Sequence, residues 1–180
     1  MKDVTPEPIE AEGTDSASLL ETLFRDAHRE LLGTLFYLVG NLEDARDALQ
    51  ETFLKCWRNQ EQVESVDNLK AWVFRIALNT GRDLRKTAWR RRREALPEES
   101  LMLANAPSPA SEIEMREQLD RVRNAVLTLR PEEQEVFLLR QNGELTYEQI
   151  AAAINVPIGT VKTRMRAALN HLRQSVGGQV

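Results

Sequence analysis

The stretch at 145–172, LTYEQIAAAINVPIGTVKTRMRAALNHL, constrains the fold most, because it encodes two short helices and the tight turn between them. Thr146 and Gln149 match a capping box, in which the threonine oxygen accepts from a free backbone N–H and the glutamine reaches back. Asn155 tolerates the left-handed backbone that ends a helix, and Pro157 cannot continue one, so a second helix should begin directly after it. The pattern predicts a helix-turn-helix.

The second helix of this motif has two different faces. Its apolar positions predict one stripe packed on the first helix, formed by Val161, Met165, Ala168, Leu169 and Leu172. The opposite face is cationic and hydrogen-bonding and has no carboxylate: Thr160, Lys162, Thr163, Arg164, Arg166 and Asn170. Such a set suits phosphates and base edges in a DNA major groove, and taken alone it equally suits a solvated face. The capping box, the turn and the positive face together favour DNA binding.

Charge is distributed unevenly along the 180 residues, whose net charge is −4. Residues 82–93 hold seven cations and one acid. By contrast, residues 1–23 hold one Lys and six carboxylates, and residues 94–120 hold one Arg and seven carboxylates. Residues 121–180 hold eight cations and five acids. Two basic blocks separated by acidic segments indicate an anionic partner, which the net charge alone would not suggest.

Several function classes are disfavoured by what the sequence lacks. The chain has one cysteine, Cys56, and two isolated histidines, His28 and His171, so we expect no disulfide, metal site, cofactor or catalytic pair. No apolar run approaches the roughly 18 residues of a membrane span, and no apolar signal segment opens the chain. We therefore expect no membrane insertion, a cytoplasmic location and no enzymatic activity.

The order of patterns predicts an all-α fold of two small helical domains joined by a flexible linker. In the first domain we expect helices at about 18–39, 42–59 and 68–93, and in the second two helices ahead of the helix-turn-helix. The predicted divisions are a disordered acidic tail at 1–17, an N-terminal helical domain at 18–94, a linker at 95–111, a C-terminal helix-turn-helix domain at 112–174 and a tail at 175–180.

Two predicted helices of the first domain have strongly charged faces. At 42–59 an acidic face indicates either a solvated surface or a docking site: Glu43, Asp44, Asp47, Gln50 and Glu51. At 68–93 a basic stripe runs along the helix: Arg75, Asn79, Arg82, Lys86, Arg90 and Arg93. Such a stripe repels itself unless an anion lies along it, which favours a nucleic-acid backbone. Gly81, costing about 1 kcal/mol relative to Ala, predicts close approach of DNA or of a neighbouring helix.

Three segments resemble the extracytoplasmic-function (ECF) sigma factors of bacterial RNA polymerase, and the similarity covers roughly residues 19–93 and 115–173. They are DARDALQETFLKCW at 44–57, AWVFRIALNTGRDLRK at 71–86 and LRPEEQEVFLLRQNGELTYEQIAAAINVPIGTVKTRMRAAL at 129–169. The resemblance implies a protein that binds core polymerase, recognises promoter −10 and −35 elements, promotes DNA melting and is controlled by an anti-sigma factor. Ala167 and Leu169 stand where the family usually has basic residues, which implies fewer −35 contacts or a different preferred sequence.

The resemblance also implies roles for individual residues. Docking on the coiled coil of the polymerase clamp falls to Asp44, Asp47, Gln50 and Glu51. Recognition and melting of the −10 element falls to Asn68, Trp72, Arg75, Asn79, Arg82, Asp83 and Lys86, with the loop at 60–68 receiving an unstacked base. Reading of the −35 element falls to Lys162, Thr163 and Arg166 at bases and Arg140, Thr160 and Arg164 at phosphates.

Two other functions fit parts of the pattern. A transcriptional activator or repressor would use only the helix-turn-helix, but the sequence has no obvious dimer helix and the basic helix would lack a task. A protein-binding module that sequesters a regulator would touch no DNA and would tolerate charge reversals along residues 75–93.

Overall fold

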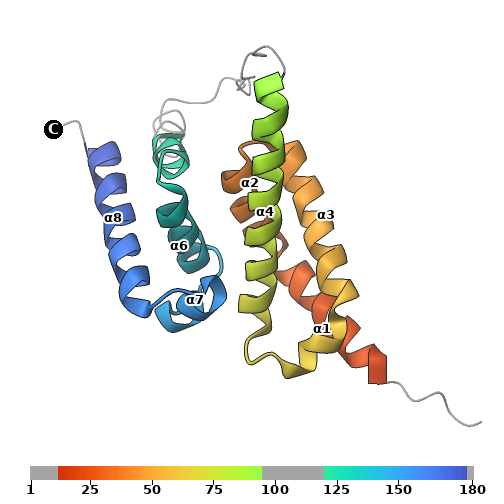
Figure 1. Cartoon of the computed structure of the whole chain (residues 1–180). Coiled ribbons are helices and arrows are strands. Elements are labelled where there is room, and N and C mark those ends of the chain that lie inside the picture. Colours follow the sequence, from red (N-terminus) through yellow and green to blue (C-terminus); the bar gives the residue numbers. More distant parts are fainter. Residues whose placement is uncertain (1–11, 95–119, 178–180) are drawn as a thin grey trace, which may run out of the picture.

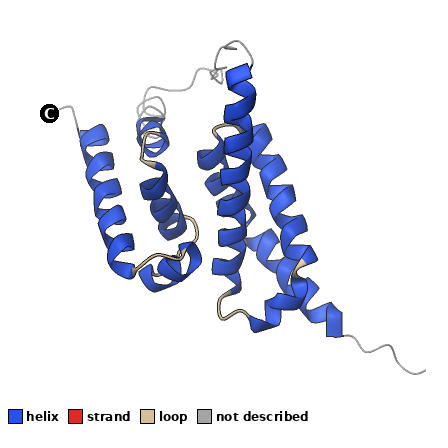
Figure 2. Ribbon diagram, viewed as in Figure 1, coloured by secondary structure: helices blue, strands red, loops and turns tan. Residues whose placement is uncertain are grey.

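The computed structural model describes residues 12–94 and 120–177, with side chains described at 16–87 and 120–175. All regular structure within these ranges is helical (Figure 2). The first group of helices comprises α1 (Glu12–Asp26), α2 (His28–Val39), α3 (Leu42–Arg58), the short 3₁₀ helix η1 (Gln60–Ser65) and α4 (Leu69–Glu94). The second comprises a helix at 120–127, α6 (Pro131–Gln141), α7 (Tyr147–Ile154) and α8 (Ile158–Gly177).

The two groups lie side by side (Figure 1). This arrangement confirms the predicted all-α fold with two helical domains. The predicted linker at 95–111 lies outside the described residues. Because α4 also packs on α7, the two domains contact one another directly in this structure.

The predicted helix at about 18–39 is two helices, α1 and α2, separated at Ala27. The apolar periodicity did not reveal the break because Leu20 and Leu31, on either side of it, both face the core. The helix α1 begins at Glu12, so the predicted disordered tail at 1–17 is wrong for residues 12–17. Residues 1–11 lie outside the described part of the chain.

The first part of α1 contacts η1. Ser16 is 5% exposed, and its hydroxyl donates to the Glu64 carboxylate with an Oγ–Oε1 distance of 3.3 Å. These residues are 48 positions apart, so no local pattern could reveal the pairing. This tertiary contact is present where composition alone predicts a tail, and packing of this kind contributes to helix stability.

The helices α2, α3 and α4 pack against one another around a core that includes Leu31, Leu35, Phe74 and Leu78. A Cβ added to Gly81 of α4 would lie 2.9 Å from Leu38 Cδ1 of α2. The interpretation of Gly81 as a close approach to a neighbouring helix is therefore confirmed. This packing fixes the rotation of α4 and hence the direction of its basic face.

The helix-turn-helix forms as the sequence predicts. The capping box is complete at Thr146 and Gln149, and Asn155 adopts the left-handed conformation with φ 53° and ψ 54°. Leu169, predicted to lie in the apolar stripe of α8, is instead 38% exposed, because the buried stripe is narrower than the periodicity suggests. The helix α8 also continues to Gly177, beyond the predicted domain end at residue 174.

Candidate nucleic-acid interface

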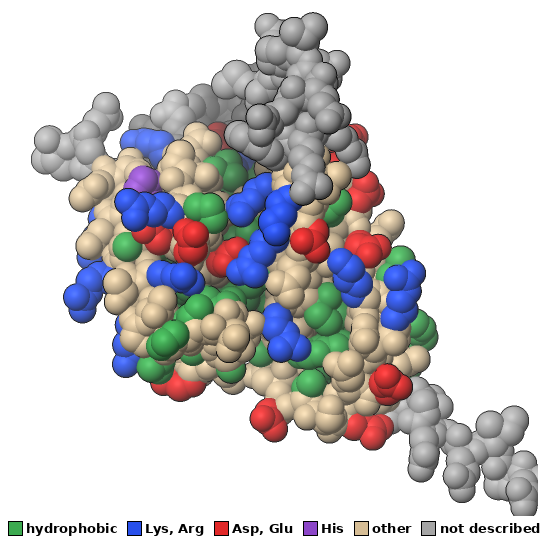
Figure 3. Space-filling view, in the orientation of Figure 1, with side chains coloured by type: hydrophobic (Ala, Val, Ile, Leu, Met, Phe, Trp, Pro, Cys, Tyr) green, Lys and Arg blue, Asp and Glu red, His purple; other side chains and the backbone are tan. Residues whose placement is uncertain are grey.

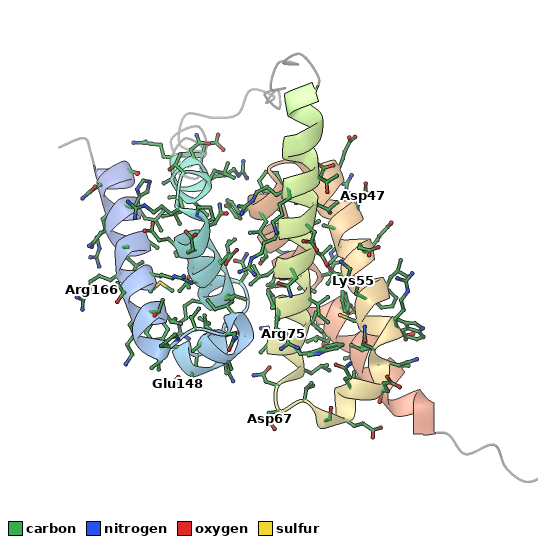
Figure 4. The ribbon with its side chains drawn as sticks, viewed as in Figure 1. Asp47, Lys55, Asp67, Arg75, Glu148 and Arg166 are labelled. Carbon is green, nitrogen blue, oxygen red and sulfur yellow. The ribbon has the colours of Figure 1, made fainter. Side chains whose placement is uncertain are left out.

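The part of the chain that the structure describes has two cationic surfaces, one on α8 and one on α4. The surface on the outer face of α8 is the more exposed to solvent. Lys162, Thr163 and Arg166 are exposed, and Thr160 and Arg164 are half-buried. The residues that turn this face outward are buried on the opposite side: Val161, Met165 and Ala168. Figure 4 shows Arg166 on the outer edge of the molecule, pointing away from the other helices. Because α8 contains no acidic residue, this face can approach an anionic surface without like-charge repulsion.

Two predicted −35 residues make hydrogen bonds within the protein, and these bonds determine which of their polar groups remain available to DNA. The Thr163 hydroxyl donates to the Gly159 carbonyl at 2.9 Å, so only its oxygen lone pairs and its methyl group remain for a base edge. Arg140 donates to the Leu145 carbonyl at 2.8 Å, and its guanidinium carbon lies 5.7 Å from the centroid of the Tyr147 ring. These contacts hold Arg140 beside the turn while leaving other N–H groups free to bind phosphate.

Glu148 is an exposed carboxylate close to this cationic surface. Hydrogen bonds from its own backbone N–H and from Thr146, assisted by the charge of Lys162, lower the pKa of Glu148. The backbone contribution follows from its place in the first turn of α7, where free N–H groups favour negative charge. Figure 4 shows Glu148 at the end of the molecule where α7 lies.

The second cationic surface lies on α4. Arg75, Asn79, Asp83 and Lys86 are exposed there, whereas Arg82 is half-buried. The side chains of Arg90 and Arg93, which extend the predicted stripe, lie outside the described residues. The exposed part of this surface therefore contains two cations, Arg75 and Lys86, one amide, Asn79, and one carboxylate, Asp83.

The beginning of α4 borders a pocket that includes several predicted −10 residues. The Asn68 Oδ1 accepts from the Ala71 backbone N–H at 2.8 Å and so caps the helix. Trp72 is only 6% exposed, and it lines the pocket together with Asn68 and Arg75. The other wall of the pocket comes from α7, through Glu148, Gln149, Ala152 and Ala153. The helix-turn-helix thus covers one side of the predicted −10 surface.

Arg82 is held by a carboxylate of the other domain. Its Nε donates to Glu135 Oε1 at 2.6 Å, and its Nη2 donates to Glu135 Oε2, so the contact is bidentate. Nη1 donates to Asn79 Oδ1 at 3.2 Å. The hydrogen bonds to Glu135 raise the pKa of Arg82 against the opposing effect of burial. The guanidinium is therefore a permanent cation with most of its donors engaged.

Two further polar contacts join the domains. Lys70 Nζ lies 3.0 Å from Glu144 Oε2, and Asn142 Nδ2 donates to Thr34 Oγ1 at 3.0 Å. Figure 3 shows basic and acidic side chains interleaved across the middle of this face. Sequence reasoning missed all these partners, which are 53 to 108 positions apart. An available signal was Glu135, a carboxylate directly before the apolar stretch VFLL.

The predicted polymerase-docking residues lie on α3, and they differ in how free they are. Asp47 and Gln50 are exposed without a hydrogen bond or ion pair among the described residues. Asp44 takes part in the N-terminal cap, accepting from Asn41 Nδ2 at 2.7 Å. Glu51 lies 3.7 Å from Lys55. Figure 4 shows Asp47 and Arg166 on opposite sides of the molecule, with Arg75 between them.

A shallow apolar pocket adjoins Gln50 of α3, one of the predicted docking residues. It is lined by Gln50 together with Phe24, Leu49, Phe53 and Leu54, and by the basic or titratable side chains of Arg25 and His28. Along the described ranges, the structure contains neither a helix able to cross a membrane nor a cluster of three acidic, His or Cys side chains suited to a metal.

Comparison with known proteins agrees with the two-domain arrangement. The family described as Sigma-70 region 2 matches residues 23–91, and the family described as Sigma-70, region 4 matches residues 119–172. The RNA polymerase sigma-E factor of Streptomyces antibioticus is 30% identical over 159 residues, covering 87% of this chain and 83% of that protein. The RNA polymerase sigma factor YlaC of Bacillus subtilis is 26% identical over 163 residues, covering 87% of this chain and 91% of that protein.

A solved structure shares the fold over most of its length. The sigma factor RpoE of Bartonella quintana, crystallised in complex with the anti-sigma factor NepR, superposes with a TM-score of 0.69 at 24% identity, covering 89% of this chain and 98% of that one. The region 2 family matches the domain that contains the acidic α3 and the basic α4. The region 4 family matches the helix-turn-helix domain that follows it. The chain belongs to the ECF group of the sigma-70 family of RNA polymerase sigma factors.

Proposed function

We propose that this chain is a dissociable promoter-specificity subunit that has no catalytic activity of its own. It binds core RNA polymerase through α3, recognises the −10 element through α4 and the −35 element through α8, and promotes strand separation. The observation that carries the proposal is the exposed face of α8, where Lys162, Thr163 and Arg166 face outward with no carboxylate on the helix. Family membership supplies the rest of the assignment.

The geometry of α8 supports the base contacts that we propose. Arg166 and Lys162 can donate to guanine acceptors, and Thr163 can present its methyl group to a thymine or accept a hydrogen bond. Arg140 and the half-buried Arg164 are better placed to hold phosphates that set the register of the helix in the groove.

The docking of polymerase depends on the two free residues of α3. Exposed Asp47 and Gln50 offer an acceptor and an amide to a basic or polar partner helix. The coiled coil of the polymerase clamp is the partner we assign to them. An anti-sigma factor that occupies the same face would keep the protein from polymerase, and a similar protein has been crystallised with such a factor.

Run-off transcription tests the function directly. Purified core polymerase is incubated with pooled genomic promoter fragments, with and without this protein. New transcripts that start downstream of a shared two-part motif are expected. Transcripts that appear only when another sigma factor is added would show an activator instead. The absence of both transcripts and polymerase association would refute the proposal.

A charge-matched pair of variants tests the docking face. Asp47→Arg combined with Gln50→Arg should abolish association with core polymerase while leaving the helical circular dichroism unchanged. The control, Glu61→Arg combined with Gln62→Arg, makes the same substitutions at two exposed positions of η1 and should still associate. Equal association of both double variants would remove the assignment of α3.

A further inference from the structure

The short helix η1 is held against the first half of α1. Ser16 and Leu20, one turn apart on α1, are 5% and 0% exposed, so the face of α1 that they share is buried. The Ser16 hydroxyl donates to Glu64 Oε1 of η1 at 3.3 Å, and the neighbouring Val63 is 5% exposed. Of the described elements, α1 is the one against which η1 mainly packs (Figure 1). The position of η1 therefore depends on α1.

The loop that follows η1 has no regular structure of its own. Residues 66–68 are not helical, and Val66 has an extended backbone with φ −91° and ψ 129°. Hydrogen bonds fix the two ends of the loop. The Ser65 hydroxyl donates to the Gln62 carbonyl at 2.8 Å within η1, and Asn68 caps α4 through its Oδ1. Because one end is tied to η1, a shift of η1 moves the loop.

This loop forms part of the pocket assigned to the −10 element. The loop and the first turns of α4 contribute polar and aromatic side chains to it: Ser65, Asp67, Asn68, Trp72 and Arg75. Figure 4 shows Asp67 where the loop leads into α4. Such a set suits the polar edge and the flat face of an unstacked base. A binding site of this kind works only when its groups are held to within about 0.5 Å, which requires supporting hydrogen bonds behind them.

We propose that α1 positions this loop for base capture, with Ser16 holding η1 through Glu64 in the place from which residues 65–68 recognise an unstacked base of the −10 element. The inference rests on the proposed function, because it concerns the same pocket. Ser16 does not line the pocket, so it is a positioning residue and not a contact to DNA. Loss of its hydroxyl should weaken recognition of one base while leaving docking through α3 and −35 reading through α8 unchanged.

The contribution of a captured base can be measured with abasic DNA. Holoenzyme assembled from core polymerase and this protein is bound to a single-stranded oligonucleotide that carries the −10 motif found by run-off transcription. The base is removed from each position in turn. For the unaltered protein, removal of the captured base should weaken binding by about tenfold or more, as expected for a base stacked on an aromatic side chain. In Ser16→Ala this abasic penalty should be smaller by about threefold or more, because the loop is less precisely held.

The matched control is Ser18→Ala. It makes the same substitution at an exposed position of the same helix and should leave the abasic penalty unchanged. Both substitutions increase the intrinsic helix propensity of α1, so a smaller penalty in Ser16→Ala cannot be attributed to a weaker helix. Circular dichroism and association with core polymerase should be the same for both variants and the unaltered chain.

Variants of Glu64 separate positioning from a direct contact with DNA. Glu64→Gln retains an acceptor oxygen and should keep most of the abasic penalty, whereas Glu64→Ala should reduce it as Ser16→Ala does. Combining Ser16→Ala with Glu64→Ala should reduce the penalty no further than either change alone, since both remove the same contact. A reduction in Glu64→Ala but not in Ser16→Ala would show that Glu64 acts without α1, and the inference would be wrong.

Failure of the inference differs from failure of the proposed function. An abasic penalty that is the same in Ser16→Ala and the unaltered chain would overturn the inference while transcription continues. The same conclusion follows if run-off transcripts form but no single base matters to the unaltered holoenzyme. Absence of transcripts from the unaltered protein would instead refute the proposed function.

Discussion

Replacing Gly81 with Ala should destabilise the protein although it improves the helix propensity of α4. In an isolated helix the substitution gains about 1 kcal/mol. In this structure the new Cβ would lie 2.9 Å from Leu38 Cδ1, 3.2 Å from Leu38 Cβ and 3.4 Å from Leu35 Cδ2. Leu38 is only 3% exposed, so its Cδ1 has little room to move aside. Its Cβ is attached to the backbone of α2 and can move only with that helix.

The balance of these effects gives the expected magnitude. Forcing an extra carbon into a packed core costs about 1–3 kcal/mol, which outweighs the propensity gain of about 1 kcal/mol. We expect a net loss of about 1 kcal/mol. For a chain of this size that corresponds to a midpoint lower by roughly 2–4 °C.

The matched control is Gly33→Ala, in the middle of α2. A Cβ there would meet only Asn142 Nδ2 at 3.6 Å, an ordinary van der Waals distance. The same substitution should therefore raise stability by about 0.5–1 kcal/mol. Thermal and urea unfolding followed by circular dichroism compare the two variants with the unaltered chain. A stabilisation of Gly81→Ala equal to that of Gly33→Ala would refute the packing argument.

Four further predictions concern single residues. Thr146→Ala should cost about 1 kcal/mol of stability in urea unfolding by removing the capping box, whereas Thr146→Ser, which keeps the hydroxyl, should leave the stability nearly unchanged. Burial raises the pKa of Cys56 to about 12, so the native thiol should resist iodoacetamide at pH 8 and react at the normal rate once the chain is unfolded in urea. Because the pKa of Glu148 is lowered by folding, its charge stabilises the protein above the unfolded pKa. This contribution is lost as the pH falls through the folded value, so the unfolding midpoints of Glu148→Gln and the unaltered chain should converge in acid. Arg166→Ala should change the −35 preference by roughly 1–3 kcal/mol at one base position in promoter selection, and uniform weakening across all sequences would show that Arg166 only holds phosphate.

The sequence by itself determined the features whose causes are local. Thr146 and Gln149 cap the helix that follows them, and Asn155 ends it in the left-handed conformation, because both effects depend on backbone groups within a few residues. The family resemblance also rested on local patterns, because each of its three motifs is a continuous stretch of sequence. Periodicity likewise predicted most of the buried core residues. It also predicted that Leu169 is buried, but Leu169 is exposed because the buried stripe of α8 is narrower.

Only the tertiary structure decided the features that depend on distant partners. The Ser16 hydroxyl reaches Glu64 of η1, Leu38 approaches Gly81, and Glu135 of the other domain occupies Arg82. Side-chain spacing records which residues share a face of one helix, but it holds no information about which face of another helix lies opposite. The basic stripe of α4 was therefore visible in the sequence, whereas the carboxylate that neutralises Arg82 was not.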